Sequence, residues 1–144
     1  MTDKDSLIAL HTALIDASHG YGEAIENSER SDLRVMFQGA KALHHKAHSD
    51  IHNVLVARGL KPDDRGSFMS SVHKTVISVH SAVARLDLKS LSAFASGEER
   101  IAQAYDRAIE GNSDDPTLLG LLERQKADLE QAISQMKAIA AAAA

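Results

Sequence analysis

The chain has 144 residues, of which 44% are hydrophobic and 25% charged, and this is the composition of one soluble, folded domain. Its 16 basic and 20 acidic side chains give a formal charge of −4, so it lacks the basic surplus that nucleic-acid binding requires. The absence of cysteine excludes disulfide scaffolds, thiolate zinc sites, iron–sulfur clusters and thiol catalysis. A transition-metal site would have to be built mainly from the eight histidines.

The sequence carries no signal for export or membrane insertion. The charged residues between Met1 and Asp5 do not fit a signal peptide. No run approaches the roughly 18 apolar residues that a membrane-spanning helix needs. We therefore expect a cytoplasmic protein that neither spans a membrane nor binds nucleic acid.

Apolar residues recur at helical spacing in the first half of the chain. The pattern predicts a first helix over about 6–27, with Ser6 as its N-cap. It predicts a second helix over 31–58, which Ser31 can cap and Gly59 ends.

Three further helices are predicted in the second half. They cover about 67–86, 88–110 and 116–142, with Asp87 as an N-cap and Pro116 in a first turn. No pair of strands is left over. The four predicted helices other than the one at 67–86 are each long enough to span a bundle. We therefore predict a single all-α domain over residues 1–144. In this antiparallel four-helix bundle, the helix at 67–86 lies in the long crossover between the second and third bundle helices.

A polar residue interrupts the apolar stripe of three predicted helices: His44, Glu98 and Gln125. Burying such groups unpaired costs about 1–3 kcal/mol each, so they should meet a partner. One interpretation is a metal site in the bundle core. The simpler one is a His44–Glu98 hydrogen bond that fixes helix register, because one His beside one Glu is a weak metal signal. The first helix offers no evident polar counterpart.

Histidines also cluster along the second helix, at His44, His45, His48 and His52. The pairs four residues apart bring imidazoles onto one helix face, at the spacing that lets two of them share an ion. A solvated histidine-rich surface explains the same pattern without a metal.

Several short motifs follow one another along the chain. They are Gly20-Tyr21 with Ala24, Phe37-Gln38, Gly59, Gly66-Ser67, Val72-His73-Lys74, Gly97-Glu98-Glu99 with Tyr105, and Glu123-Arg124-Gln125. Their order over about residues 6–140 resembles a bacterial family of ferritin-like four-helix-bundle proteins grouped as a domain of unknown function. The resemblance implies a ferritin-like bundle with a helical crossover, and it implies no established activity.

Ferritin-type di-iron sites use a Glu on each of two helices and a Glu-x-x-His motif on each of the others. By that resemblance, Glu98 matches the Glu expected on the third bundle helix, whereas Glu23 lies late in the first helix. No Glu is placed to form the motif with the histidines at 44–48, and the segment 123–126 ends without a His. Both double motifs are therefore missing.

Our leading hypothesis is a protein that binds one transition-metal ion (Fe, Zn or Cu) through His44, His48 and Glu98. Further candidate ligands are His45, His52, Glu23 and Gln125. The alternative is a metal-free structural or interaction protein, acting as a homodimer or binding a protein partner. A degenerate di-iron oxidase is the third hypothesis, and no catalytic residue is assigned because no nucleophilic or acid–base constellation is evident.

Overall fold

The computed structural model describes residues 3–65 and 86–143. These residues form four α-helices and one short 3-10 helix, with no strand among them. The elements are α1 (Asp3–Asn27), α2 (Ser31–Ala57), η1 (Leu88–Ser90), α4 (Leu91–Gly111) and α5 (Pro116–Ala143). The all-α prediction is confirmed, while the predicted helix at 67–86 lies outside the described residues.

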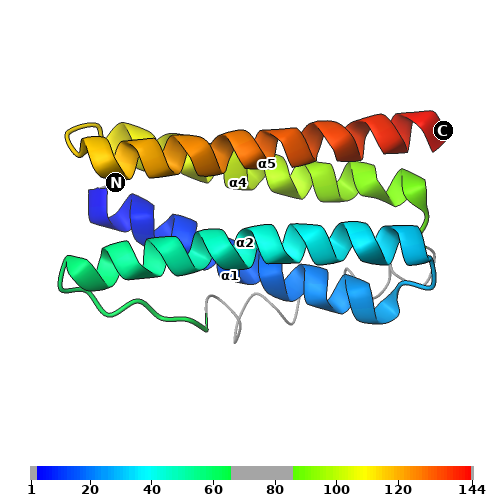
Figure 1. The fold of residues 1–144 in the computed structure, drawn as a ribbon, viewed down its shortest axis with the longest axis horizontal. Helices are drawn as coiled ribbons and strands as arrows, with labels where there is room; N and C mark the ends of the chain where they lie inside the picture. Colours follow the sequence, from blue (N-terminus) through cyan, green and yellow to red (C-terminus); the bar gives the residue numbers. More distant parts are fainter. Residues whose placement is uncertain (1–2, 66–85, 144) are drawn as a thin grey trace.

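The four long helices lie side by side along one axis (Figure 1). Helices α1 and α5 run in one direction along this axis, and α2 and α4 run in the other. Helix α2 ends and η1 begins at opposite ends of the molecule, so the connection between them has to cover the length of the helices.

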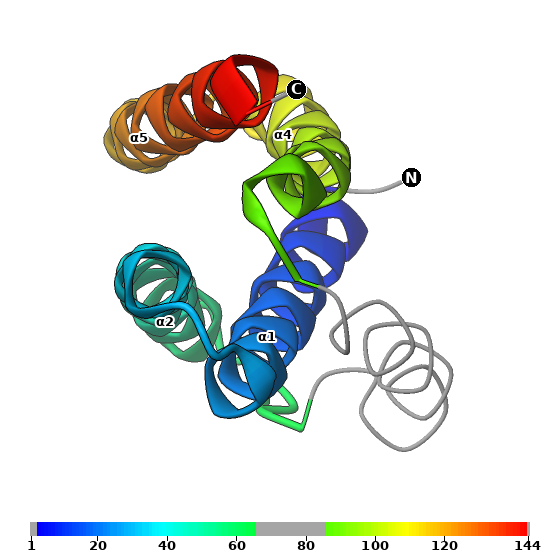
Figure 2. The same cartoon turned by 90° about the vertical axis from the view of Figure 1, so that its right-hand side faces the viewer.

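The helices pack as two pairs, α1 against α2 and α4 against α5. Contacts between α1 and α4 join the pairs, whereas α2 and α5 touch each other much less (Figure 2). The arrangement therefore has one loosely packed seam, between α2 and α5.

The predicted apolar stripes point inward and form one continuous core. Each fully buried Leu, Ile or Phe side chain contributes about 1.5–3 kcal/mol through removal of apolar surface from water. Some buried positions differ from those that the helical spacing predicts: near the C-terminal ends of α2 and α5 the buried residues are Leu55, Ile133 and Ala140, whereas Val54 and Ile139 are only partly buried. The largest fully buried apolar side chains are Phe37, Leu7, Leu10, Leu14, Leu33, Ile51, Leu55, Leu91, Leu122, Leu129 and Met136.

Two predicted N-caps are wrong. Helix α1 begins at Asp3, so Ser6 lies inside the helix, where it is buried. Helix α2 begins at Ser31 itself, and the extended backbone that precedes a helix is found at Arg30. Arg30 makes no side-chain cap bond. Instead its guanidinium binds the carboxylate of Asp32, with Nη2 and Oδ2 2.8 Å apart.

Three predicted boundary signals are confirmed. The Asp87 carboxylate accepts a hydrogen bond from the backbone N–H of Ser90 in a capping box, and the chain then continues through η1 into α4. Helix α5 starts at Pro116, whose missing N–H costs nothing in a first turn. Gly59 follows the end of α2 with a φ of +80°, a left-handed conformation that other residues adopt at a cost.

Candidate metal centre

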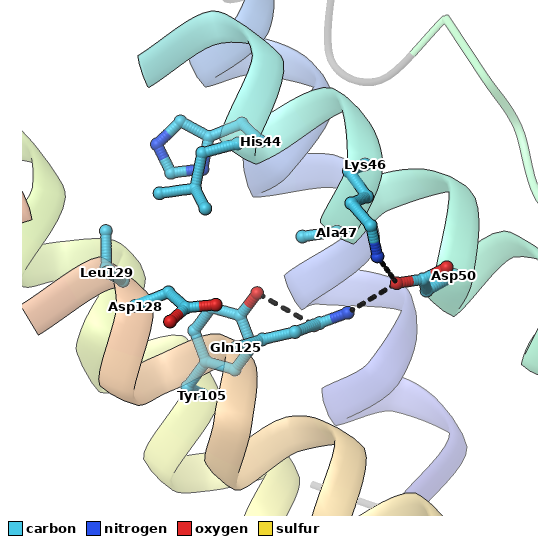
Figure 3. Close-up of a pocket in the computed structure, with 9 residues that line it drawn as sticks. His44, Lys46, Ala47, Asp50, Tyr105, Gln125, Asp128 and Leu129 are labelled. Carbon is cyan, nitrogen blue, oxygen red and sulfur yellow. Dashed lines mark hydrogen bonds and ion pairs between the residues drawn. The ribbon is translucent and has the colours of Figure 1, made fainter. Parts of the chain in front are cut away.

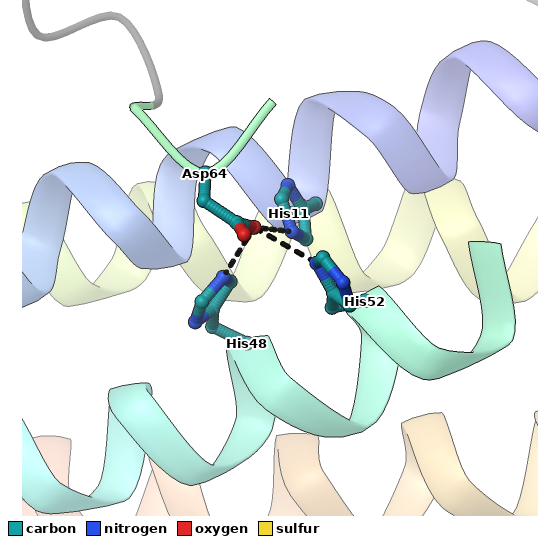
Figure 4. Close-up of side chains that lie close together, drawn as sticks. All are labelled: His11, His48, His52 and Asp64. Carbon is teal, nitrogen blue, oxygen red and sulfur yellow. Dashed lines mark hydrogen bonds and ion pairs between the residues drawn. The ribbon is translucent and has the colours of Figure 1, made fainter. Parts of the chain in front are cut away.

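Three imidazoles and one carboxylate meet on the outer side of the α1–α2 pair (Figure 4). His11 comes from α1, His48 and His52 come from successive turns of α2, and Asp64 comes from the segment after α2. The reversal at Gly59 sends the chain back past the last turns of α2, which brings Asp64 over the three rings. One donor atom from each side chain lies within 4.8 Å of every other.

The carboxylate oxygen Asp64 Oδ1 is the common neighbour of the three imidazoles. It lies 2.8 Å from His52 Nδ1, 3.2 Å from His48 Nε2 and 3.4 Å from His11 Nε2. Ligand atoms around a tetrahedral zinc ion at about 2.0–2.1 Å are separated from one another by about 3.3 Å. The oxygen-to-nitrogen distances therefore already resemble those of a coordination shell.

His11 is the unusual member of the cluster. His11 is only 1% exposed. Its Nε2 is buried without a hydrogen bond, because the contact with Asp64 Oδ1 at 3.4 Å lacks hydrogen-bonding geometry. An unsatisfied buried polar atom costs about 1–3 kcal/mol, so a native protein rarely keeps one without a purpose. Coordination of an ion would satisfy this nitrogen.

The electrostatics keep His11 neutral and Asp64 ionised. Burial lowers the pKa of His11 to about 4, and the neighbouring His48 and His52 also lower it, whereas Asp64 raises it. Burial pushes the pKa of Asp64 upward, but the hydrogen bonds and the electrostatic attraction of His48 and His52 together hold it below its ordinary value. A neutral imidazole and an ionised carboxylate are the forms that bind metal ions.

A separate polar layer lies in the bundle core. His44 Nε2 is 2.9 Å from Glu98 Oε1 and 2.8 Å from Glu98 Oε2, and the Tyr21 hydroxyl donates to Oε1 at 2.9 Å. All three residues are buried. Because a carboxylate only accepts, the hydrogen-bond network assigns a proton to His44 Nε2. The predicted His44–Glu98 hydrogen bond is confirmed.

Tyr21 is the polar partner from α1 that sequence reasoning missed. Its ring occupies a position in the apolar stripe of α1, and only the packed structure shows that its hydroxyl reaches Glu98. Burial raises the pKa of Tyr21 well above its usual value, and the charge of Glu98 adds to this shift. The phenol therefore stays protonated and remains a hydrogen-bond donor.

Gln125 hydrogen-bonds to Tyr105 and Asp50 and not to His44 or Glu98; Figure 3 shows these two bonds. Its Oε1 accepts from the Tyr105 hydroxyl at 2.9 Å, and its Nε2 donates to Asp50 Oδ2 at 3.4 Å. These groups line a cavity of about 50 Å³ at the seam between α2 and α5. The expected layer of His44, Glu98 and Gln125 is thus two separate networks.

The structure separates the predicted ligands His44, His48 and Glu98. His44 points into the core toward Glu98, whereas His48 binds Asp64 on the other side of α2. Of the further candidates, His52 joins the Asp64 cluster, and exposed His45 only approaches it, with its ring 5.9 Å from that of His48.

Two members of the cluster, His11 and Asp64, were not predicted as ligands, and the predicted Glu23 lies elsewhere. Glu23 contacts the Asn27 side chain within α1. The sequence did hold a signal for His11, because it interrupts the apolar repeat of the first helix between two core leucines. Asp64 stands in a turn-forming segment with Pro and Gly neighbours and gave no comparable signal.

Residues 4–111 match a family profile described as a domain of unknown function (DUF2383). The chain belongs to this family. It has no significant match among curated proteins or among solved structures. The DUF2383 match includes the whole His11, His48, His52 and Asp64 cluster, but it ends before α5. Among the described helices of this DUF2383 protein, none has the length and apolar composition that a membrane span requires.

Proposed function

We propose that this DUF2383 protein binds one transition-metal ion through His11, His48, His52 and Asp64. The observation that carries the proposal is the buried His11 Nε2, which has no hydrogen bond and faces the other three donors. The proposal keeps the expected single ion and changes its ligands. The proposed ligand set contains His11, His52 and Asp64 in place of His44 and Glu98.

The donor set indicates the kind of ion. Three imidazole nitrogens and one carboxylate oxygen suit Zn²⁺, which favours four ligands in a tetrahedron. The same donors suit Cu²⁺ and Fe²⁺, whereas Mg²⁺ and Ca²⁺ prefer shells made of oxygen. We propose Zn²⁺ as the preferred ion, with Cu²⁺ and Fe²⁺ as competitors.

We propose a structural role for the His44–Glu98 pair. Both oxygens of Glu98 are already engaged, by His44 Nε2 and the Tyr21 hydroxyl. An ion at this place would have to displace hydrogen bonds that are satisfied in the core. The three residues come from α2, α4 and α1, so their bonds favour one register among three helices.

We also propose that the fold is ferritin-like, without a di-iron centre. The opposed directions of neighbouring helices and the long connection from α2 to α4 support the fold assignment. Two bridged irons need several carboxylates. Within residues 3–65 and 86–143, the one group of three or more candidate ligands contains a single carboxylate, Asp64. A degenerate di-iron oxidase is therefore the less supported alternative.

Metal content and titration test the proposal. Tag-free protein purified without nickel should take up one equivalent of Zn²⁺ or Co²⁺ by titration calorimetry, and His11→Leu and His52→Ala should lose this binding. His45→Ala is the matched control, because His45 lies on α2 beside the cluster and contributes no donor to it. Equal binding by wild-type, His11→Leu and His52→Ala proteins would overturn the proposal.

A further inference from the structure

We infer that Asp64 is the exchangeable ligand of this centre, through which the ion enters and leaves, while the three imidazoles form its fixed part. This inference rests on the proposed metal binding and adds how the site exchanges its ion. It also predicts that a small anion can take the coordination position of Asp64.

Exposure of the four side chains defines the solvent side of the cluster. The His11 and His48 side chains are 1% and 15% exposed, and that of His52 is 30% exposed. The Asp64 side chain is 56% exposed. Figure 4 shows its carboxylate between the three rings, reaching them from the segment after α2 rather than from α1 or α2. An ion that approaches from solvent therefore meets Asp64 first.

The backbone segments that carry the ligands differ in how extensively they are packed. All three histidines lie within α1 and α2, whose packing against each other is the most extensive in the described structure. Withdrawing the buried His11 imidazole from the ion would require repacking at this interface. Asp64 lies in a turn beyond the end of α2, so rotation of its side chain can withdraw the carboxylate without moving either helix.

The mode of contact makes Asp64 easy to displace. A single oxygen, Oδ1, faces all three imidazoles, so the carboxylate would supply one coordination bond. In the absence of an ion, that oxygen pairs with His48 and His52. Water or a small anion such as azide can replace one exposed oxygen ligand while the three nitrogens hold the ion.

Asp63 provides a matched control for the charge of Asp64. Its carboxylate accepts hydrogen bonds from the backbone N–H and the guanidinium of Arg65 at 2.9 and 3.1 Å, so it is committed to the turn. Asp63→Asn keeps an oxygen that can accept the backbone bond. It removes the same charge as Asp64→Asn from the adjacent position, without removing a ligand.

Release kinetics test the inference. Protein loaded with one Zn²⁺ is mixed with an excess of a colorimetric chelator in a stopped-flow instrument. Asp64→Asn should raise the release rate constant about 10-fold or more, because one ligand bond no longer has to break. Asp63→Asn should stay within about twofold of wild type, as expected for an exposed charge. Equal release rates for Asp64→Asn and Asp63→Asn would overturn the inference.

Cobalt substitution provides a second readout. Azide should change the visible absorption of the Co²⁺ protein, and Asp64→Asn should respond at an azide concentration about 10-fold lower. Spectra of both proteins that azide leaves unchanged would contradict an exchangeable position. If wild-type protein binds neither Zn²⁺ nor Co²⁺ at one equivalent, the proposed function itself fails. If it binds and Asp64→Asn behaves as wild type, only the role of Asp64 fails.

Discussion

His44 on α2 and Glu98 on α4, 54 residues apart in the sequence, form a buried pair with Nε2 and Oε2 2.8 Å apart. The pair ties the α1–α2 half of the bundle to the α4–α5 half at its centre. Removing either residue would leave the other buried and short of a hydrogen-bond partner, with Glu98 keeping only the Tyr21 hydroxyl, and this costs more than a lost surface contact. Stability measurements can therefore separate this pair from the metal centre.

The His44→Ala substitution should lower the free energy of unfolding by about 1–3 kcal/mol, because Glu98 then stays buried with the Tyr21 hydroxyl as its one remaining side-chain donor. Denaturant unfolding in the presence of a chelator measures this effect without a metal contribution. His45→Ala, at an exposed neighbouring position, should change stability by less than about 0.5 kcal/mol. An unchanged unfolding midpoint for His44→Ala would contradict the buried pair.

The Tyr21→Phe substitution should cost about 1–2 kcal/mol, because it removes only the hydroxyl that donates to Glu98. A double-mutant cycle with Glu98→Gln tests whether the two groups interact. We expect a coupling energy of about 1 kcal/mol between the two positions. Additive effects of the two substitutions would show that the hydroxyl contributes independently of Glu98.

Zinc should stabilise the folded protein. A ligand at about 100 times its Kd adds about 2.7 kcal/mol when it binds only the native state. For a domain of this size, that corresponds to a rise in Tm of about 5–10 °C, measured by thermal unfolding followed by circular dichroism. The rise should disappear in His11→Leu. A similar rise in His11→Leu would instead indicate binding elsewhere on the chain.

Acid should destabilise the metal-free protein through His11. Its pKa in the folded state is about 4, below the ordinary value of 6.5, so between these values the unfolded chain binds the additional proton. The contribution of His11 is therefore fully present above pH 6.5 and is lost as the pH falls toward 4. At pH 5 the loss should amount to about 2 kcal/mol relative to pH 7.

Chelator-treated wild-type and His11→Gln proteins, unfolded in denaturant at pH 7 and pH 5, isolate this contribution. The stability of His11→Gln should fall less between the two pH values than that of wild type. Parallel losses in both proteins would assign the acid sensitivity to other groups.

Several features of the fold could be predicted because they depend on neighbouring residues. The 3.6-residue apolar repeat, the Asp87 cap, the Pro116 start and the glycine after α2 each act within a turn or two of helix. Predicted ends differ from the observed ones by a few residues, as at Ser6, where cap preference alone did not locate the start of α1.

The polar layer could be predicted only in part. His44 and Glu98 interrupt apolar stripes, and a polar group in a stripe needs a partner whatever the fold. Gln125 interrupts a stripe too, but α5 meets α2 only loosely, so its amide binds Tyr105 and Asp50 at the seam. Which stripe residues meet depends on interhelical distances, which the repeat of one helix does not contain.

The sequence by itself determined the four long helices, most of their buried faces and His44 and Glu98 as polar residues that need a buried partner, because these follow from local periodicity and the cost of burying unpaired polar groups. Only the tertiary structure decided which residues form the proposed metal centre. His11 and Asp64 meet His48 and His52 because α1 packs on α2 and the chain turns back after Gly59. Ligand geometry depends on atoms from three segments, and their relative positions are set by packing rather than by spacing along the chain.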